Sequence, residues 1–354
     1  MSWLERGLDL SASTAVTHAR ARATRWAGRI ALSLSDFDRQ ERYLTLARTL
    51  WEELGDQRGI AVSLTEYSSL LWRRGEIERS AEIDQQALAI HRAVGNPWGI
   101  AHCLVGIGAA KAMAGRHDEA ITWYTEGINV CRASGDISTE AWVEAYLAMA
   151  IFNTGDLARG AAHAQNMERL ARLLDDRRKL VDALYLQAGI ALEQAEYQQG
   201  LSMAAEAASI FGELGNVHTE AIALFLLGGF LLRLDRLDEA VATYARALPT
   251  WVSMGTPVEV ATCLQETAPL ALALGRADDA ALLLGAGEAR RAALNAPTSP
   301  PDQERFGEVM ATARELRGDA VAEKAWHAGQ EMSLEAAIAL ALDVCHVRAE
   351  ASAA

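Results

Sequence analysis

The sequence predicts an all-α fold: a right-handed superhelical solenoid of about seven 40-residue helix pairs, followed by a helical C-terminal cap. Three observations predict it: a 40-residue period, small residues at fixed positions within that period, and apolar spacing that is helical throughout. The stretch 99–136, GIAHCLVGIGAAKAMAGRHDEAITWYTEGINVCRASGD, recurs in near-copies over most of the 354 residues. Helix pairs that recur at such a period stack on one another, so we expect an elongated molecule with almost no sheet.

A short turn motif marks the end of each repeat. Its central residue is Gly, Asn or Asp, and these residues tolerate the left-handed backbone conformation that ends a helix. The copies of this motif are Leu54-Gly55-Asp56, Val94-Gly95-Asn96, Ser134-Gly135-Asp136, Leu174-Asp175-Asp176, Leu214-Gly215-Asn216, Met254-Gly255-Thr256 and Leu294-Asn295-Ala296. They predict one helix C-terminus at the end of every repeat.

Three positions within the repeat stay small, which indicates that another helix crosses closely at each of them. The first position holds Gly28, Ser68, Gly108, Ala148, Ala188, Gly228 and Ala268. The second holds Ser80, Ala120, Gly160, Gly200, Ala240 and Ala280, with Gln40 as the exception. The third holds Ala47, Ala87, Gly127, Ala207, Ala247 and Gly287, with Met167 as the exception.

The clearest repeat resembles the tetratricopeptide repeat. The matching residues are Leu104, Ile107-Gly108, Gly115, Asp118-Glu119-Ala120, Tyr124 and Gly127-Ile128. Lys111 departs from the pattern, because an aromatic residue is usual between the two glycines. The usual unit has about 34 residues, so the resemblance implies that the second helix of each pair is longer here. The resemblance covers residues 4–296.

We expect four segments along the chain: a half repeat at 1–16, seven repeats at 17–296, a proline-rich loop at 297–301 and a helical cap at 302–354. The half repeat matches only a second helix, so apolar surface near Trp3, Leu4 and Leu8 lacks its cover. Either the chain is part of a longer protein or the half repeat is a natural cap. A weak homodimer that hides this edge is a further expectation.

The tail predicts three helices, at about 302–317, from about 320, and at about 334–344 with Ser333 as its N-cap. Trp326, Leu334 and Ile338 are the residues expected to contact the seventh repeat. LLLGAGEARRAAL, followed by DQERFGEVMATARELRGDAVAEKAWHAGQEMSLEAAIALAL, resembles the MalT-like C-terminal sensor region of bacterial STAND ATPase regulators of the LuxR and SARP types. The resemblance implies a sensor arm. The chain itself has no GxxxxGK[ST] phosphate loop and no basic recognition helix.

Composition excludes several classes of partner. The formal net charge of −14 disfavours direct contact with nucleic acid or anionic membrane. The cysteines Cys103, Cys131, Cys263 and Cys345 form no CxxC pair and lie in apolar helical runs, which is typical of reduced core thiols in a cytoplasmic protein. No apolar stretch is long enough to span a bilayer, and MSWLERGLDL has no signal-peptide pattern.

The sequence shows no catalytic or cofactor motif, so we expect neither an enzyme nor a cofactor. Gly106-Ile107-Gly108 and Gly285-Ala286-Gly287 do not continue to GxGxxG, and we interpret them as packing glycines. The histidines have no zinc-site spacing. Acidic residues begin several second helices, where they offset the helix dipole. They are Asp118-Glu119, Asp238-Glu239 and Asp278-Asp279.

In the tetratricopeptide family the first helices line the concave surface, and the resemblance carries this groove over by the register of Gly108. In the clearest repeat the groove residues are His102, Val105, Ala109, Ala112 and Met113. In other repeats they are Thr65, Trp72, Arg73, Trp142, Met149, Phe152, Asn153, Asp182, Tyr185, Glu193, Phe225 and Arg233. Aromatic rings flanked by charges suit a binding cleft. The alternative is that these rings pack between adjacent first helices.

Arg22, Arg25 and Arg29 lie at helical spacing on one face of the first repeat. They are either an anion-binding patch, or a solvated face that supplies counter-ions to the acidic helices. Two functions remain open: the sensor arm of a signalling or transcriptional regulator that recognises a protein, peptide or small effector, and a free-standing adaptor that scaffolds a partner. Both use the same groove.

Overall fold

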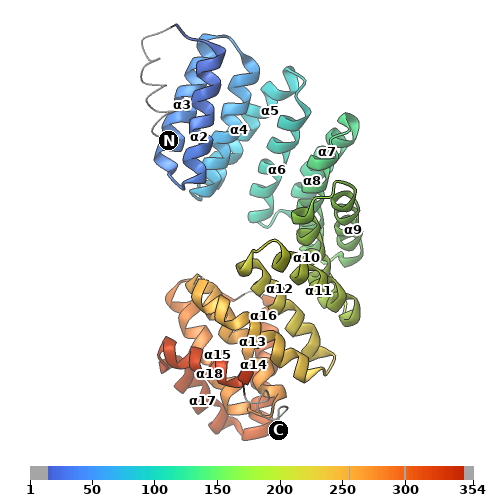
Figure 1. Ribbon diagram of the computed structural model, residues 1–354, viewed down its shortest axis with the longest axis vertical. Helices are drawn as coiled ribbons and strands as arrows, with labels where there is room; N and C mark the ends of the chain where they lie inside the picture. The colour runs from blue at the N-terminus through green and yellow to red at the C-terminus, as the bar shows by residue number, and fades with distance from the viewer. Residues whose placement is uncertain (1–14, 255, 299, 347–354) are drawn as a thin grey trace. The chain divides into compact units, whose positions relative to one another are not determined.

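The computed structural model describes residues 15–254, 256–298 and 300–346 (Figure 1). In these residues the chain forms helices α2 to α18 and no strand. They fall into two compact units, residues 1–179 and 180–354, and the boundary lies inside α10. Residues 1–14 of the half repeat expected at 1–16, and residues 347–354 of the tail, lie outside the described residues.

Seven helix pairs occupy the region expected for the repeats. They are α2 (His18–Ser33) with α3 (Phe37–Glu53), α4 (Gln57–Arg73) with α5 (Ile77–Ala93), α6 (Pro97–Met113) with α7 (His117–Ser134), α8 (Ile137–Phe152) with α9 (Leu157–Leu173), α10 (Arg177–Glu193) with α11 (Tyr197–Glu213), α12 (Val217–Arg233) with α13 (Leu237–Met254), and α14 (Pro257–Ala273) with α15 (Ala277–Ala293). We call the even-numbered member of each pair the first helix and the odd-numbered member the second helix.

The repeat unit divides into two equal halves. A residue with positive φ ends the first helix and another ends the second, at Ser35, Gly55, Gly75, Gly95, Gly115, Gly135, Gly155, Asp175, Ala195, Gly215, Asp235, Gly275 and Asn295. The left-handed ends expected after the second helices are confirmed wherever the chain is described. The extra length of the repeat is not confined to the second helix, as was expected, because the two helices of a pair are alike in length, with 17 residues in both α4 and α5.

The residue after each left-handed position often caps the next helix. The Asp56 Oδ1 accepts the backbone N–H of Gly59 at 3.0 Å, and the Asp136 Oδ1 accepts that of Thr139 at 3.0 Å. A carboxylate here satisfies one of the unpaired N–H groups of the first turn. A Gly–Asp pair therefore stops one helix and starts the next within a single tight turn.

Small residues on the first helix make room for the second helix of the same pair, as expected. A Cβ added to Gly108 would lie 2.5 Å from the Tyr124 ring, and one added to Gly228 would lie 2.6 Å from the Tyr244 ring. Both tyrosines are almost fully buried. The packing interpretation of Gly108 is therefore confirmed, because the small residue and the ring on the partner helix fill one site together.

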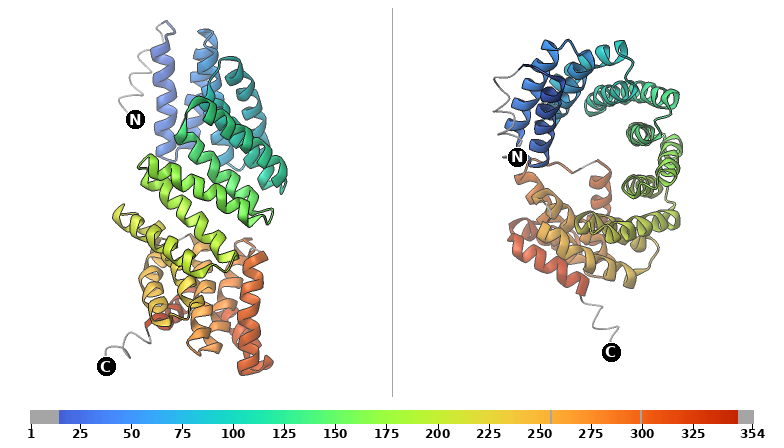
Figure 2. Two further views of the ribbon diagram at one scale, coloured as in Figure 1. Left: turned by 90° about the vertical axis from the view of Figure 1, so that its right-hand side faces the viewer. Right: turned by 45° about the horizontal axis from the view of Figure 1, so that its top comes forward.

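The first helices of successive repeats also contact one another. In the first unit α4 contacts α6 and α6 contacts α8; in the second unit α12 contacts α14 (Figure 2). The first helices are thus an inner layer within each unit.

The tail forms α16 (Pro300–Arg317), α17 (Asp319–Glu331) and α18 (Leu334–His346). Helix α17 packs on α15, α16 contacts α14 and α15, and α18 contacts α13, α14 and α15. The expected loop at 297–301 is shorter than predicted, because Pro300 already lies in the first turn of α16. Leu334, which was expected to contact the seventh repeat, is 41% exposed, whereas Ala337, Ala341 and Val344 of the same helix are fully buried.

Candidate functional site

A cavity of about 470 Å³ opens on the first-helix side of the second unit, and we call it the groove cavity. Four residues that the register of Gly108 assigned to the groove line it together. They are Tyr185 and Glu193 on α10, and Phe225 and Arg233 on α12. Further walls come from α13, α14 and the N-terminal half of α16. The cavity has the size and mixed lining of small-ligand and side-chain pockets.

An aromatic stack forms one wall of the groove cavity. The rings of Phe225 and Trp251 are nearly parallel, with centroids 4.3 Å apart, and the edge of Tyr244 meets Phe225 at 5.0 Å. Phe225 is only 6% exposed, so it belongs to the core as well as to the cavity wall. The indole Nε1 of Trp251 is buried and has no hydrogen-bond partner within the described part of the chain.

An ion-pair cluster fixes α16 against α14 at the other wall. The Arg305 Nη1 donates to the Glu266 Oε2 at 2.6 Å, and its Nη2 donates to Asp302 at 2.8 Å. Burial alone would lower the pKa of Arg305, but the hydrogen bonds and charges of Glu266 and Asp302 raise it overall. Arg305 therefore stays charged, and its charge is balanced inside the cavity.

The remaining charges of the groove cavity are mainly negative. Three lining carboxylates form no ion pair with any described residue: Glu193, Glu304 and Glu308. The lining Arg233 donates a hydrogen bond to the Gly229 carbonyl at 3.1 Å. Burial against the cavity walls raises the pKa of Tyr185, and the Glu266 carboxylate adds to the shift. An aromatic surface beside unpaired carboxylates can hold cationic groups with apolar stems.

In the first unit the predicted groove residues form an aromatic ladder between α6 and α8. The His102 ring lies 4.2 Å from that of Trp98 and stacks on Trp142 at 4.4 Å, and Trp142 meets the edge of Tyr146 at 5.4 Å. Burial lowers the pKa of His102 to about 4, so the imidazole is neutral near pH 7. The Trp142 ring thus packs between adjacent first helices, which is the alternative that the sequence left open. Its role in ligand binding stays a prediction.

Three predicted groove residues are buried and do not line the groove cavity. Thr65 is buried, where its hydroxyl contacts the Nε2 of His91 at 3.1 Å and donates to the Ala61 carbonyl at 3.1 Å. Val105 and Ala109 are buried in the core of the first unit. The register of the resemblance is too coarse to tell core positions from groove positions, because the apolar stripe of a helix that faces the core is itself about 100° wide.

The other predicted groove residues are at least partly accessible. Trp72, Ala112 and Phe152 are partly buried. Arg73, Met113, Met149, Asn153 and Asp182 are more open, and Met113 and Met149 are exposed.

Two arginines of α2 lie close to one acidic side chain, that of Glu66. The Arg25 Nη1 donates to the Glu66 Oε1 at 3.0 Å, and Arg29 lies 3.9 Å from the same oxygen while it covers the Trp26 ring at 4.6 Å. Burial raises the pKa of Glu66, and the charge of Arg25 opposes this shift. Arg25 and Arg29 are therefore counter-ions of a buried carboxylate, whereas Arg22 is exposed.

The sequence did not point to Glu266, Trp251 or Arg305 as cavity residues. Glu266 lies outside the positions singled out on first helices, Trp251 is on a second helix, and Arg305 is in the tail. One sequence feature relates to Trp251: Trp51 occupies the same position in another repeat. Packing of α16 on α14 brings these residues together, and no local pattern encodes it.

Residues 59–133 match the tetratricopeptide repeat family. Together with the stacked helix pairs, this match decides the fold. The chain has a tetratricopeptide-like helical solenoid fold. Its helix pairs carry the repeat signature most clearly in α4 to α7, which is where the match lies.

Solved structures of other repeat scaffolds are similar to this one. The apo form of RapI is 12% identical, with a TM-score of 0.63 over 78% of this chain and 99% of that chain. A Rap protein complexed with competence and sporulation factor is 14% identical, with a TM-score of 0.57 over 88% and 92%. A STAND protein with a tetratricopeptide repeat sensor from Pyrococcus horikoshii is 11% identical, with a TM-score of 0.50 over 87% of this chain and 44% of that chain.

A search of curated protein sequences finds no match to this chain. Across the described residues, no group of three or more His, Cys, Asp or Glu side chains could hold a metal ion. No helix in those same ranges is long and apolar enough to cross a membrane. All four cysteines are free and buried, in line with the predicted core thiols.

Proposed function

We propose that the protein is a non-catalytic binding scaffold that holds a segment of a partner protein or peptide on its first-helix face, with the groove cavity as the principal contact. One observation carries this proposal: Tyr185, Glu193, Phe225 and Arg233, assigned to a groove from sequence register, line a single cavity. The similarity to a Rap protein complexed with competence and sporulation factor supports a peptide as the ligand.

The chemistry of the cavity selects a segment with a basic residue next to an apolar one. Tyr185 and the Phe225–Trp251 stack offer apolar area for affinity. Glu193 and Glu308 offer carboxylates that no described residue neutralises. Such charges steer association and fix the orientation of a bound chain.

The test is a selection of short random peptides displayed against the whole chain, followed by fluorescence polarisation of the selected sequences. We expect enrichment of Lys or Arg beside aromatic or aliphatic residues. Tyr185→Ala should weaken binding roughly tenfold or more, because an interface tyrosine that fills a pocket contributes more than about 1 kcal/mol. A double variant, Glu193→Gln with Glu308→Gln, should weaken binding and reduce its dependence on salt.

Leu214→Ala is the matched control, since Leu214 is 48% exposed in the same unit but does not line the cavity. The Leu214→Ala variant should bind the selected peptides as tightly as the wild type does. Selected peptides that bind Tyr185→Ala and the double glutamate variant as tightly as the wild type would place the site elsewhere and refute the proposal.

Within this function, the finer assignment is a sensor arm of a bacterial signalling or transcriptional regulator in the cytoplasm. The resemblance of residues 282–342 to regulator C-termini supports it, and a small effector is the alternative ligand. A free-standing adaptor is the second candidate. The reading frame of the complete gene separates them, because a sensor arm requires an ATPase module in the same polypeptide and an adaptor does not.

A further inference from the structure

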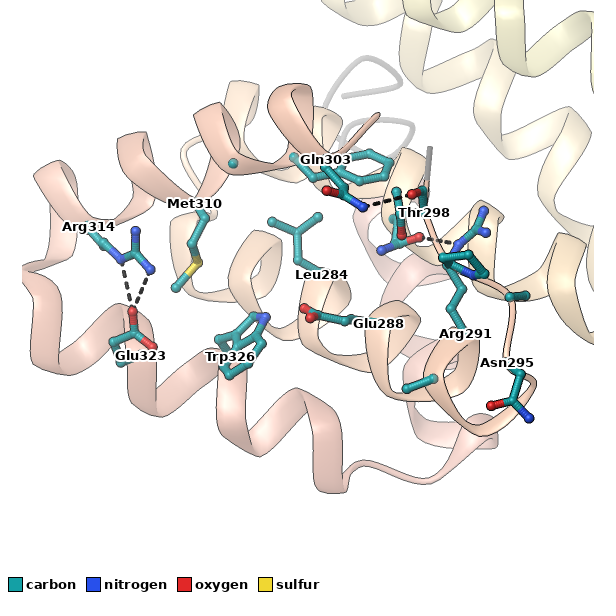
Figure 3. Close-up of a pocket in the computed structure, with 16 residues that line it drawn as sticks. Leu284, Glu288, Arg291, Asn295, Thr298, Gln303, Met310, Arg314, Glu323 and Trp326 are labelled. Atoms are coloured by element: carbon teal, nitrogen blue, oxygen red, sulfur yellow. Dashed lines mark hydrogen bonds and ion pairs between the residues drawn. The ribbon is translucent and has the colours of Figure 1, made fainter. Parts of the chain in front are cut away.

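A second and larger cavity, of about 830 Å³, lies between the seventh repeat and the tail (Figure 3). We call it the cap cavity. Helices α14 and α15 form one side of it, and α16 and α17 form the other. It is separate from the groove cavity, because Arg305 of α16 lines the groove cavity while Phe306 and Met310 line the cap cavity.

Apolar side chains form much of the lining of the cap cavity. Leu284 comes from α15, Phe306 and Met310 from α16, and Trp326 from α17. Phe306 and Met310 are buried and Trp326 is partly buried, so these walls are fixed by packing. A cavity of this size and composition is typical of sites for small organic ligands.

The two arginines that line the cap cavity already donate hydrogen bonds to protein oxygens. The Arg314 Nη2 pairs with the Glu323 Oε1 at 2.6 Å. The Arg291 Nε donates to the Gln265 Oε1 at 2.8 Å, and its Nη2 donates to the Thr262 Oγ1 at 2.5 Å. An anionic ligand would have to compete with these contacts.

One acidic group of the lining is not satisfied in this way. The Glu288 carboxylate forms no hydrogen bond or ion pair with any residue that the structure describes. In Figure 3 it extends from α15 into the space between Leu284 and Trp326. A carboxylate beside an indole face recognises a cation through both its charge and the quadrupole of the ring.

We propose that the cap cavity is a binding site for a small organic ammonium compound with an apolar or aromatic body. The ammonium group pairs with Glu288 and lies against Trp326, while the apolar body fills the space beside Leu284, Phe306 and Met310. This assignment uses the apolar walls together with the one lining carboxylate that pairs with no described residue. It does not depend on peptide binding at the groove cavity.

The probe is 2-phenylethylammonium, titrated into the whole chain by isothermal calorimetry. The matched probes are 2-phenylethanol, which is neutral, and 3-phenylpropionate, which is anionic. The wild type should bind the ammonium compound at least roughly tenfold more tightly than either analogue. Equal affinities for the three compounds, or no binding of the ammonium compound, would overturn the proposal.

Three variants locate the site. Glu288→Gln should weaken binding of 2-phenylethylammonium roughly tenfold or more without lowering the melting temperature, because Glu288 is exposed and pairs with no described residue. Glu315→Gln, an exposed carboxylate on α16 outside the cavity, should leave the affinity unchanged. Loss of binding in Glu193→Gln but not in Glu288→Gln would assign the cation to the groove cavity and refute the proposal.

Discussion

Gly285 of α15 and Gly329 of α17 each lie where the backbone of the other helix passes. A Cβ added to Gly285 would overlap the carbonyl oxygen of Trp326, and one added to Gly329 would overlap that of Leu282. The two glycines let α15 and α17 cross in backbone contact. This crossing holds the tail against the seventh repeat and fixes one side of the cap cavity.

Gly329→Ala should therefore lower the stability of the second unit by about 1–3 kcal/mol, because the obstacle is backbone that cannot rotate away. Gly189→Ala on α10 is the control, since nothing lies within 4 Å of its added Cβ. It should stabilise by up to about 1 kcal/mol through helix propensity. Chemical denaturation checks both, and equal effects in the two variants would show that the α15–α17 crossing is not tight.

Ala195 ends α10 at a φ of 56°, a conformation that an alanine adopts only with strain. Ala195→Gly should raise the free energy of unfolding by about 0.5–1 kcal/mol, because glycine has no Cβ to clash there. Ala242→Gly in the exposed interior of α13 makes the same chemical change and should cost about 1 kcal/mol. Opposite shifts of the two melting temperatures are the expected result, and two shifts of the same sign would contradict it.

Asp84 on α5 is 4% exposed, and its burial raises its pKa to about 7, with the Ser68 hydroxyl opposing the shift. The folded state then holds this proton over a range where the unfolded chain, with a pKa of about 3.9, has lost it. The contribution of Asp84 to the free energy of unfolding is therefore fully present at low pH, and it is lost as pH rises from about 4 to about 7.

Asp84→Asn should accordingly be more stable than the wild type at about pH 8, by up to about 4 kcal/mol, and nearly equal to it at about pH 4. The control is Glu82→Gln at an exposed position of the same helix, which should change stability by less than about 0.5 kcal/mol. Urea denaturation at both pH values measures the difference. A stabilisation by Asp84→Asn that is the same at both pH values would show that folding does not raise the pKa of Asp84.

Trp142 stacks on His102 and keeps water from the imidazole. Trp142→Ala should cost about 2–4 kcal/mol and move the pKa of His102 from about 4 back toward 6.5. His102 weakens the fold as pH falls below about 6.5, because only the unfolded imidazole then gains a proton freely. The variant should lose this acid sensitivity.

Proton NMR titration of the His102 ring measures the pKa directly. Trp26→Ala is the control in the same unit, since Trp26 is 50% exposed and should cost less than about 1 kcal/mol. If Trp142→Ala leaves both stability and the pKa of His102 unchanged, the ring is not part of the packing between α6 and α8.

The sequence alone determined the helical repeat architecture. Gly108 and Tyr124 illustrate why: they lie on the two helices of one pair, and the missing Cβ of one makes room for the ring of the other. Such pairs recur, so the period shows them. The turn glycines can also be recognised locally, because a residue in the left-handed conformation ends the helix that directly precedes it. The equal length of the two helices in a pair was not predicted from the sequence.

Only the tertiary structure decided which polar and aromatic residues are available to a ligand. Arg25 is neutralised by Glu66 from 41 positions away, Arg305 by Glu266 from 39, and Phe225 is covered by Trp251. Each pairing depends on the angle and spacing of helices from different repeats or from the tail. A side chain a few ångströms nearer becomes a counter-ion or a core ring, and one slightly farther away stays open, as Glu288 does. Helical periodicity fixes the face on which a residue lies, but the distance to the neighbouring helix fixes its role.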